Sequence, residues 1–368
     1  MCPFFWEGCG MFQKRESRRS IVKAGAGLIV AGAAVGKGTV FAQGTPGATL
    51  DATPAVKGSG KLIAYSGQHE DLVMAFADAF HMETGITLEI RSGGDSDLAN
   101  QIIEEGDQTN ADLFITEEPG PAGTLDSKDL LAPIEAASLA KVDKRFSPEN
   151  GHWLGYGARS RAIFYNPDLI AESALPASIL DLPKDEWKGT YAYAPSGAFT
   201  STVTYIINTE GADKTLEWLK GIDATGENLL KNGAIRDAVE AGQYAFGLSN
   251  HYYWYVLAKE KGGADKLESK VHFMKGQDPG GLVFASAVAV LKAGKNQELA
   301  QKFVSWLADA KGGQAVLASA SPQYPLAPGV ESSYDLPPFS ELDPPIFDQG
   351  SLKDSDKAIE LIVEAGLI

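Results

Sequence analysis

Side chains with oxygen or nitrogen donors lie directly after several apolar, strand-like runs of the sequence. His69 follows the first such run, Glu117 follows the third, and the pair Tyr252 and Tyr253 follows a later one. In an open α/β sheet, ligands bind outside the carboxyl ends of the strands. The positions of these four side chains therefore predict a binding site with oxygen and nitrogen donors.

The adjacent tyrosines Tyr252 and Tyr253 are the most informative of these residues. A phenol has a pKa near 10, so only a strong Lewis acid would hold two phenolates at neutral pH. Two phenolates and one carboxylate neutralise a tripositive ion, and an imidazole adds a neutral donor. Divalent zinc would leave this set over-charged and is more often bound by thiolates or several imidazoles. If the four residues meet, their hard, oxygen-rich donors favour ferric iron.

The spacing of these residues along the chain does not show that they meet. An aromatic run such as Tyr252–Tyr255 is also typical of core packing, and His69 alone is compatible with a loop histidine without a function. Core packing therefore stays open as an alternative at this stage.

Strand-like and helix-like patterns alternate along the chain after residue 60. Helix-like segments carry apolar residues at helical spacing, as Leu72, Phe76 and Phe80 do. This alternation predicts an α/β fold in which parallel sheets carry helices on both faces. We expect strands at 62–65, 86–90, 111–115, 161–165, 190–194, 243–248, 270–274 and 282–291, and helices at 70–83, 96–105, 199–208, 213–220, 234–241, 251–261, 295–310 and 355–365.

Two extended segments, Arg159–Asn166 and Gly281–Leu291, are candidates for hinge strands that link two lobes. A two-lobed chain would bring two sheet edges face to face across a cleft. We expect the first lobe to comprise residues 60–158 and 283–333, and the second lobe to comprise residues 159–282 and 334–368.

The first 42 residues have the features of an export signal. Ser17–Lys23 contains paired arginines, the mildly apolar run Ala24–Gly36 follows, and small residues precede a cleavage point after Ala42. This pattern predicts a twin-arginine signal peptide at 1–42, with export to the periplasm or the outer face of the cytoplasmic membrane. A basic start to a cytosolic domain is the alternative. Residues 43–59, rich in Thr, Pro, Gly and Ala, predict a flexible leader.

Charge and cysteine content narrow the possible functions. The full chain carries a formal net charge of −16 and residues 1–42 contribute +4, so the remainder carries −20. Such an acidic body repels nucleic acid and anionic membrane surfaces and tolerates a cationic cargo. Both cysteines, Cys2 and Cys9, lie in the predicted signal peptide, so the exported protein would have no disulfide and no thiolate metal site.

The chain resembles the periplasmic ferric-ion-binding proteins of ATP-driven iron importers in five motifs, which occur in the order YSGQHE, ADLFITEE, SGAF, NHYYWYVLAKEKG and QDPGG. The resemblance extends from about Lys61 to Ile368. It implies a two-lobed type II periplasmic-binding-protein fold, in which each lobe is a mostly parallel sheet flanked by helices and two hinge strands join the lobes.

This resemblance implies a transport function and no enzymatic activity. The protein would capture ferric iron in an interlobe cleft and deliver it to the permease and ATPase of an ABC importer. The implied metal ligands are His69, Glu117, Tyr252 and Tyr253. An exogenous anion such as phosphate or carbonate would be bound by Ser196, Gly197, Ala198, Asn232 and Asn250. Free main-chain N–H groups at a helix start near Ser196 agree with an anion there, although Ser196 could be a plain N-cap.

Three further residues are candidates for a supporting role around the ligands. Arg159 is a possible partner of the anion or of Glu117. Glu118 stands where the resemblance leads us to expect glutamine, and it would repel phosphate unless protonated or turned away. His251 replaces an asparagine beside the tyrosine pair. The identity of the anion therefore stays open among phosphate, carbonate, citrate and water.

Two other functions remain as alternatives. A binding protein of the same architecture could take an organic ligand such as a polyamine, thiamine or a phosphonate, with aromatic residues at 252–255 stacking on it. A secreted hydrolase could use Glu117 and His69 as acid and base, but the sequence holds no HExxH pair and no Gly-x-Ser-x-Gly elbow. We expect a monomer that binds no nucleic acid and meets the twin-arginine translocase during export.

Overall fold

The computed structural model describes residues 59–353 and 355–368. The predicted signal peptide and nearly all of the predicted leader therefore lie outside the described residues. Within the described part of the chain, no helix is both long and apolar enough to cross a membrane.

The first sheet has the strand order β2-β1-β3-β10-β5. Strands β1 (Gly60–Ser66), β2 (Ile86–Ser92) and β3 (Leu113–Thr116) are parallel, and β10 (Val283–Leu291) runs antiparallel to β3. The short strands β4 (Leu131–Ala132) and β11 (Tyr324–Pro325) pair with β10 and β5. The helices of these segments are α1 (Glu70–Thr84), α2 (Asp95–Glu105), α3 (Pro119–Ser127), α4 (Ala136–Leu139), α9 (Gln297–Leu307) and α10 (Gly313–Ala320).

The second sheet has the strand order β5-β8-β6-β7. Strand β6 (Tyr191–Tyr193) is parallel to β7 (Glu227–Asn228) and to β8 (Phe246–Asn250), whereas β9 (Lys270–His272) pairs antiparallel with β5. Its helices are α5 (Ala198–Glu210), α6 (Ala212–Thr225), α7 (Asn232–Glu240), α8 (His251–Lys261) and α11 (Ser355–Glu364). The predicted alternation of strands and helices is therefore confirmed in both sheets.

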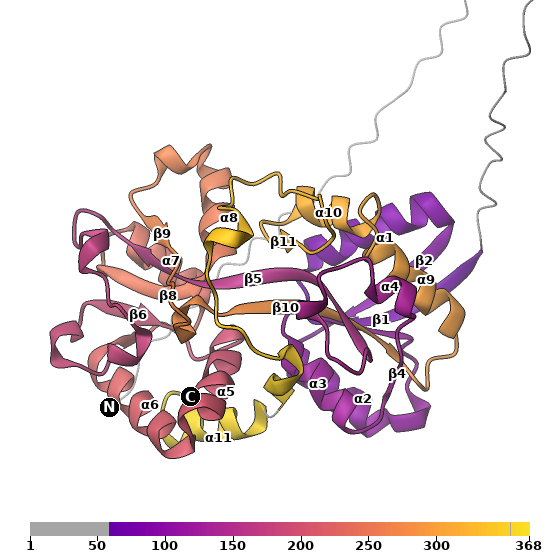
Figure 1. The fold of residues 1–368 in the computed structure, drawn as a ribbon, viewed down its shortest axis with the longest axis horizontal. Helices are drawn as coiled ribbons and strands as arrows, with labels where there is room; N and C mark the ends of the chain where they lie inside the picture. The colour runs from indigo at the N-terminus through magenta and orange to yellow at the C-terminus, as the bar shows by residue number, and fades with distance from the viewer. Residues whose placement is uncertain (1–58, 354) are drawn as a thin grey trace, which may run out of the picture. The chain divides into compact units, whose positions relative to one another are not determined.

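Strand β5 (Trp153–Tyr165) belongs to both sheets, as Figure 1 shows. Its residues up to Ser160 pair with β10, and its residues from Arg161 onward pair with β8. The predicted extended segment 159–166 covers only the second half of this strand, because the strand begins at Trp153. With β10, β5 forms the pair of strands that links the two sheets.

Each sheet has its own hydrophobic core. In the first core the rings of Phe80 and Phe303 pack edge to face with centroids 5.1 Å apart, and in the second Tyr191 stacks on Phe246 at 5.3 Å. We call the first sheet with its helices the first lobe, and the second sheet with its helices the second lobe. Leu342 packs in the first core and Leu361 in the second, so the C-terminal segment contacts both. The predicted lobe boundaries stay predictions.

A β-bulge in β5 lies close to the predicted site. Gly157 pairs with Ser286 and Gly155 with Ala287, so Tyr156 has no partner in β10. A bulge bends the strand and redirects a side chain. Here the Tyr156 hydroxyl accepts a hydrogen bond of 2.8 Å from Gln68 Nε2, which ties β5 to the residue before His69.

Alanine at position 155 is expected to destabilise the protein by about 1–3 kcal/mol. The new Cβ would collide with the main-chain oxygen of Phe146, and backbone yields less readily than a side chain. Gly233→Ala is the matched control, because a Cβ there meets nothing within 4 Å and alanine favours the helical state of α7. Urea unfolding followed by circular dichroism measures both variants. Equal midpoints for Gly155→Ala and the parent protein would contradict the prediction.

Candidate metal centre

The four predicted metal ligands lie together in the structure, although up to 184 residues separate them in the sequence. His69 Nε2 lies 3.3 Å from the Tyr252 hydroxyl and 3.1 Å from Glu117 Oε1. The rings of Tyr252 and Tyr253 stack with centroids 4.3 Å apart. Within residues 59–353 and 355–368, no group of three or more His, Cys, Asp or Glu side chains could hold a metal ion.

Each predicted ligand is placed by the end of a strand or the start of a helix. His69 is the N-cap of α1, and its main-chain N–H donates to Gln68 Oε1 at 3.0 Å. Glu117 follows β3, and Tyr252 and Tyr253 lie in the first turn of α8, which begins directly after β8. Two of the predicted ligands therefore come from the first lobe and two from the second, and the pairing of β5 with β10 and β8 brings them together.

Asp95 holds the main chain of the Glu117 segment. As the first residue of α2, it accepts hydrogen bonds at Oδ2 from the N–H groups of Glu117 (2.9 Å) and Glu118 (3.0 Å). Burial, followed by the negative charge of Glu117, raises the pKa of Asp95 to about 8. Asp95 therefore fixes the main chain that carries Glu117.

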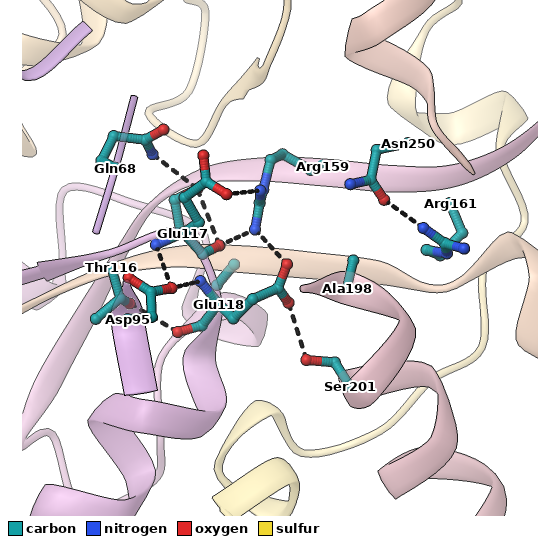
Figure 2. A network of polar contacts seen from close by, with 12 residues as sticks. Gln68, Asp95, Thr116, Glu117, Glu118, Arg159, Arg161, Ala198, Ser201 and Asn250 are labelled. Carbon is teal, nitrogen blue, oxygen red and sulfur yellow. Dashed lines mark hydrogen bonds and ion pairs between the residues drawn. The ribbon is translucent and has the colours of Figure 1, made fainter. Parts of the chain in front are cut away.

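The buried guanidinium of Arg159 is the main positive charge beside the predicted ligands. It pairs with Glu117 Oε2 at 3.2 Å and with Glu118 Oε1 at 2.6 Å, and its side chain is only 2% exposed (Figure 2). It also donates to the main-chain oxygen of Glu117 and lies 5.9 Å from the centroid of the Tyr252 ring. Arg159 thus holds one oxygen of Glu117, and the other oxygen of Glu117 faces His69.

The structure adds a second buried arginine that the sequence reasoning missed. Arg161 donates to Asn250 Oδ1 at 2.8 Å, and burial lowers its pKa to about 10, so it remains charged at neutral pH (Figure 2). Because side chains alternate along a strand, Arg159 and Arg161 share one face of β5. This spacing was the signal in the sequence that could have identified Arg161.

Burial keeps both tyrosines of the site protonated in the absence of a metal. It raises the pKa of Tyr252 well above 10, and the negative charge of Glu117 adds to this effect. Burial also raises the pKa of Tyr253. A ligand that binds through phenolate oxygens must therefore displace two protons, which requires a strong Lewis acid.

The predicted anion-binding residues all lie in the second lobe. Gly197, with φ of 58°, is the N-cap of α5, and Ala198 is the first helical residue. No described residue accepts a hydrogen bond from the main-chain N–H of either. Ser196 is therefore not the N-cap that the sequence left open. Its hydroxyl instead donates to the main-chain oxygen of Leu230 at 3.2 Å.

The two asparagines of this group each accept a hydrogen bond from a strand residue, Asn232 from Ser249 of β8 and Asn250 from Arg161 of β5. Asn232 begins α7, and its Oδ1 accepts a hydrogen bond of 3.3 Å from the Ser249 hydroxyl. Asn250, the N-cap of α8, holds Arg161. Polar groups thus continue from the N-terminus of α5 to the N-terminus of α8, where the tyrosine pair begins.

A pocket of about 320 Å³ lies beside Glu117 and is lined by both lobes. The first lobe contributes Gly67, Gly94, Asp95, Ser96, Asp97, Glu117, Glu118, Gly120 and Pro121, and the second contributes Gly197, Thr200, Ser201, Ser355 and Ile359. The pocket therefore joins the predicted metal ligand Glu117 to the start of α5.

Glu118 and His251 differ from the residues that the resemblance leads us to expect, and both contact other residues of the protein. Glu118 is buried and accepts hydrogen bonds from Arg159 and, at 2.9 Å, from the Ser201 hydroxyl of α5. His251 is fully buried, its Nδ1 accepts from the N–H of Ser160 at 3.1 Å, and burial lowers its pKa to about 4. Its ring stacks on Tyr324. His251 is therefore a neutral packing residue behind the tyrosine pair.

The remaining aromatic residues of the 252–255 run pack in the second lobe. Trp254 and Tyr255 belong to a cluster with Ile235 and Val239 and are less than 10% exposed. Trp254 and Tyr255 thus pack as the core-packing alternative describes. Tyr252 is also buried, but its hydroxyl lies 3.3 Å from His69 Nε2.

The chain is similar to known bacterial proteins that bind solutes or ferric iron. Residues 75–344 match the family model described as bacterial extracellular solute-binding protein. A Serratia marcescens protein named Fe(3+)-binding periplasmic protein is 38% identical over 308 residues, which cover 83% of this chain and 90% of that protein. The major ferric iron-binding protein of Neisseria meningitidis serogroup B is 35% identical over 86% of this chain and 95% of its own length.

Solved structures give a similar result. Iron-bound HitA from Pseudomonas aeruginosa is 41% identical, with a TM-score of 0.79 over 83% of this chain and 99% of that chain. The Trichodesmium protein IdiA (FutA), solved in complex with iron and citrate ligands, is 26% identical, with a TM-score of 0.72 over 84% of this chain and 100% of its own.

Proposed function

Because the chain belongs to the bacterial extracellular solute-binding proteins, we propose that it captures ferric iron outside the cytoplasm and delivers it to an ABC importer. Its fold is the two-lobed type II fold of periplasmic binding proteins, as the sequence predicted. It is accordingly a transport protein and not an enzyme. The observation that carries the proposal is the convergence of His69, Glu117, Tyr252 and Tyr253 from two lobes.

The charge of the four donors supports iron as the cargo. Two phenolates and the Glu117 carboxylate together supply three negative charges, and the His69 imidazole supplies a neutral nitrogen. A tripositive, hard cation fits this set in both charge and donor type. The names of the Serratia and Neisseria relatives and the iron in the HitA structure agree with the same cargo.

We place an exogenous anion next to the metal, between the start of α5 and the start of α8. Main-chain N–H groups of Gly197 and Ala198 would donate to it, together with Ser196, Asn232 and Asn250. Arg161 joins this proposed group because it is buried, charged and bound to Asn250. A helix N-terminus and a buried guanidinium both attract negative charge. The citrate in the Trichodesmium structure supports an anion of this kind.

We infer that binding closes the two lobes about β5 and β10. The tyrosine pair on the second lobe would bind the metal first, and His69 and Glu117 on the first lobe would then complete the site in an interlobe cleft. Ligands that come from two lobes make closure depend on the metal. Opening of the lobes at the importer would release the ion to the permease, whose ATPase drives uptake.

We further propose that the protein is exported by the twin-arginine route and acts as a monomer in the periplasm or at the outer face of the cytoplasmic membrane. The Serratia relative is named as periplasmic. The paired arginines of Ser17–Lys23 support the twin-arginine route. Replacing both arginines with lysine tests the route. An unchanged exported fraction in cell fractionation would exclude it.

A titration of the purified chain with ferric citrate tests the proposed cargo. We expect a visible absorption band that saturates at one iron per chain, because phenolate oxygens bound to Fe³⁺ give a ligand-to-metal charge-transfer band. Zinc should give no band. Isothermal titration with a polyamine, thiamine and a phosphonate tests the organic-ligand alternative. Absence of a visible band, with heat released by one of these organic compounds, would overturn the iron proposal.

A further inference from the structure

Gln68 is a buried residue that connects the main chain of His69 to strand β5. It is only 3% exposed, whereas the side chain of His69 is 54% exposed. Gln68 Oε1 accepts a hydrogen bond of 3.0 Å from the main-chain N–H of His69, and Gln68 Nε2 donates to the Tyr156 hydroxyl at 2.8 Å. One amide group thus links an exposed predicted ligand to the interior of the first lobe.

The β-bulge of β5 brings two partners of Gln68 to the same point. Tyr156 is the unpaired residue of the bulge, and Ser286 of β10 lies where the register shifts. The Ser286 hydroxyl is 3.5 Å from Gln68 Nε2 and 3.4 Å from the main-chain oxygen of Glu117. Its shorter contact is a hydrogen bond of 2.9 Å to Gln323 Oε1. The two strands that link the lobes therefore contact both segments that carry the first-lobe ligands.

The residues of this network have fixed surroundings. Tyr156 and Ser286 are fully buried, Gln323 is buried, and the ring of Tyr156 packs edge to face on Phe76 with centroids 5.7 Å apart. Within the described part of the chain, the side-chain polar atoms of Gln68, Tyr156, Ser286 and Gln323 are not among the buried atoms that lack a hydrogen-bond partner. A satisfied buried network makes its members rigid.

The ring of His69 depends on this rigidity for its direction. It contacts two other predicted ligands, Tyr252 and Glu117, and half of its surface is exposed. Its main chain, in contrast, is held on both sides. Gln68 binds the N–H group, and the carbonyl oxygen accepts hydrogen bonds of 3.1 Å from the N–H groups of Leu72 and Val73 in α1.

We propose that Gln68 is a positioning residue for iron binding, which is anchored at Tyr156 and holds the main chain of His69 so that the imidazole meets the metal. A ligand must be held within about 0.5 Å and about 10–20° of its productive geometry, and packed neighbours with hydrogen bonds supply this order. The inference rests on the proposed function. Gln68 acts through His69 and does not bind the metal itself.

Two substitutions remove the anchor in different ways. Tyr156→Phe removes the hydroxyl and keeps the ring that packs on Phe76, and Gln68→Met keeps the length of the side chain and removes both hydrogen bonds. We expect each to lower iron affinity about tenfold in citrate competition, because loss of a group that orients a metal ligand costs about 10–100-fold. The visible band should keep its wavelength, since both phenolates remain.

A double-mutant cycle with His69→Ala separates positioning from a general effect on the structure. Without the imidazole, Gln68 has no ligand to position, so Tyr156→Phe or Gln68→Met should then change iron affinity by less than about twofold. A residue that only stabilises the fold would give the same loss with His69 present or absent. Urea unfolding identifies the folded variants, and Gln68→Met carries the cycle if Tyr156→Phe does not fold.

Tyr191→Phe is the matched control. Tyr191 is also fully buried, and its hydroxyl lies 2.9 Å from the Thr225 hydroxyl in the second lobe. Loss of this hydroxyl removes a buried hydrogen bond of the same kind without touching the His69 segment. We expect Tyr191→Phe to lower stability and to keep the iron affinity of the parent protein.

The inference fails if Tyr156→Phe and Gln68→Met lower affinity equally in the presence and absence of His69, or if Tyr191→Phe causes the same loss. It also fails if His69→Ala binds iron as tightly as the parent protein, because Gln68 would then have no ligand to orient. Absence of an iron band in the parent protein would instead refute the proposed function. The two failures are therefore distinguishable.

Discussion

Phenylalanine at position 252 or 253 is expected to abolish the visible iron band or shift it strongly, and to weaken iron binding by more than about 100-fold. Loss of a residue that only supports a metal ligand already costs about 10–100-fold in affinity, so loss of a ligand should cost more. Each substitution removes one phenolate and one negative charge and keeps the ring that packs in the stacked pair. Ferric citrate titrations followed by absorption measure both effects.

Tyr255→Phe is the matched control for these variants. Tyr255 lies on the same helix α8, but it packs beside Trp254 and His251 and has no contact with His69 or Glu117. We expect it to keep both the band and the affinity of the parent protein. A full visible band in both single variants, Tyr252→Phe and Tyr253→Phe, would contradict the assignment of the ligands. An equal loss of the band in Tyr255→Phe would contradict it as well.

The regular part of the fold could be predicted from the sequence because its elements carry clear periodicity. The run from β1 through α1 to β2 was predicted to within two residues at every end, and Gly85 ends α1 in the left-handed conformation. Helix α3 was missed because it begins Pro-Gly-Pro and has little apolar periodicity. The first half of β5 was missed because Gly155 and Gly157 interrupt its strand pattern, and both flank the bulge.

The site was predictable only in part for a different reason. Strand ends and donor chemistry pointed to His69 and the tyrosines, but their meeting depends on contacts between lobes, which no local pattern encodes. Asp95 and Ser201 were missed for this reason, since each acts on the Glu117 and Glu118 segment from a distant part of the chain. The sequence predicted that Glu118 would repel phosphate unless it is protonated or turned away. Its pairing with Arg159 required the structure.

Iron affinity should fall about 100-fold for each unit by which pH decreases near neutrality. Burial raises the pKa of Tyr252 well above 10 and also raises that of Tyr253, so both phenols carry their protons in the metal-free protein. Binding iron as two phenolates therefore releases two protons, and each released proton contributes a factor of ten per pH unit. Because protons compete with the metal, the sign is fixed: acid favours release.

Citrate competition between about pH 7 and 8, corrected for the protonation of citrate and the hydrolysis of ferric ion, measures iron affinity at each pH. The slope is the change in the logarithm of this affinity per pH unit. We expect a slope of two for the parent protein and for Tyr255→Phe. Tyr253→Phe has one phenol left at the site, so its slope should be one, measured against a weaker chelator because its affinity is lower. A slope near zero in the parent protein would mean that iron binds without displacing the phenolic protons. The raised pKa values would then have no part in the affinity, and the paired tyrosines would be neighbours of the metal and not its ligands.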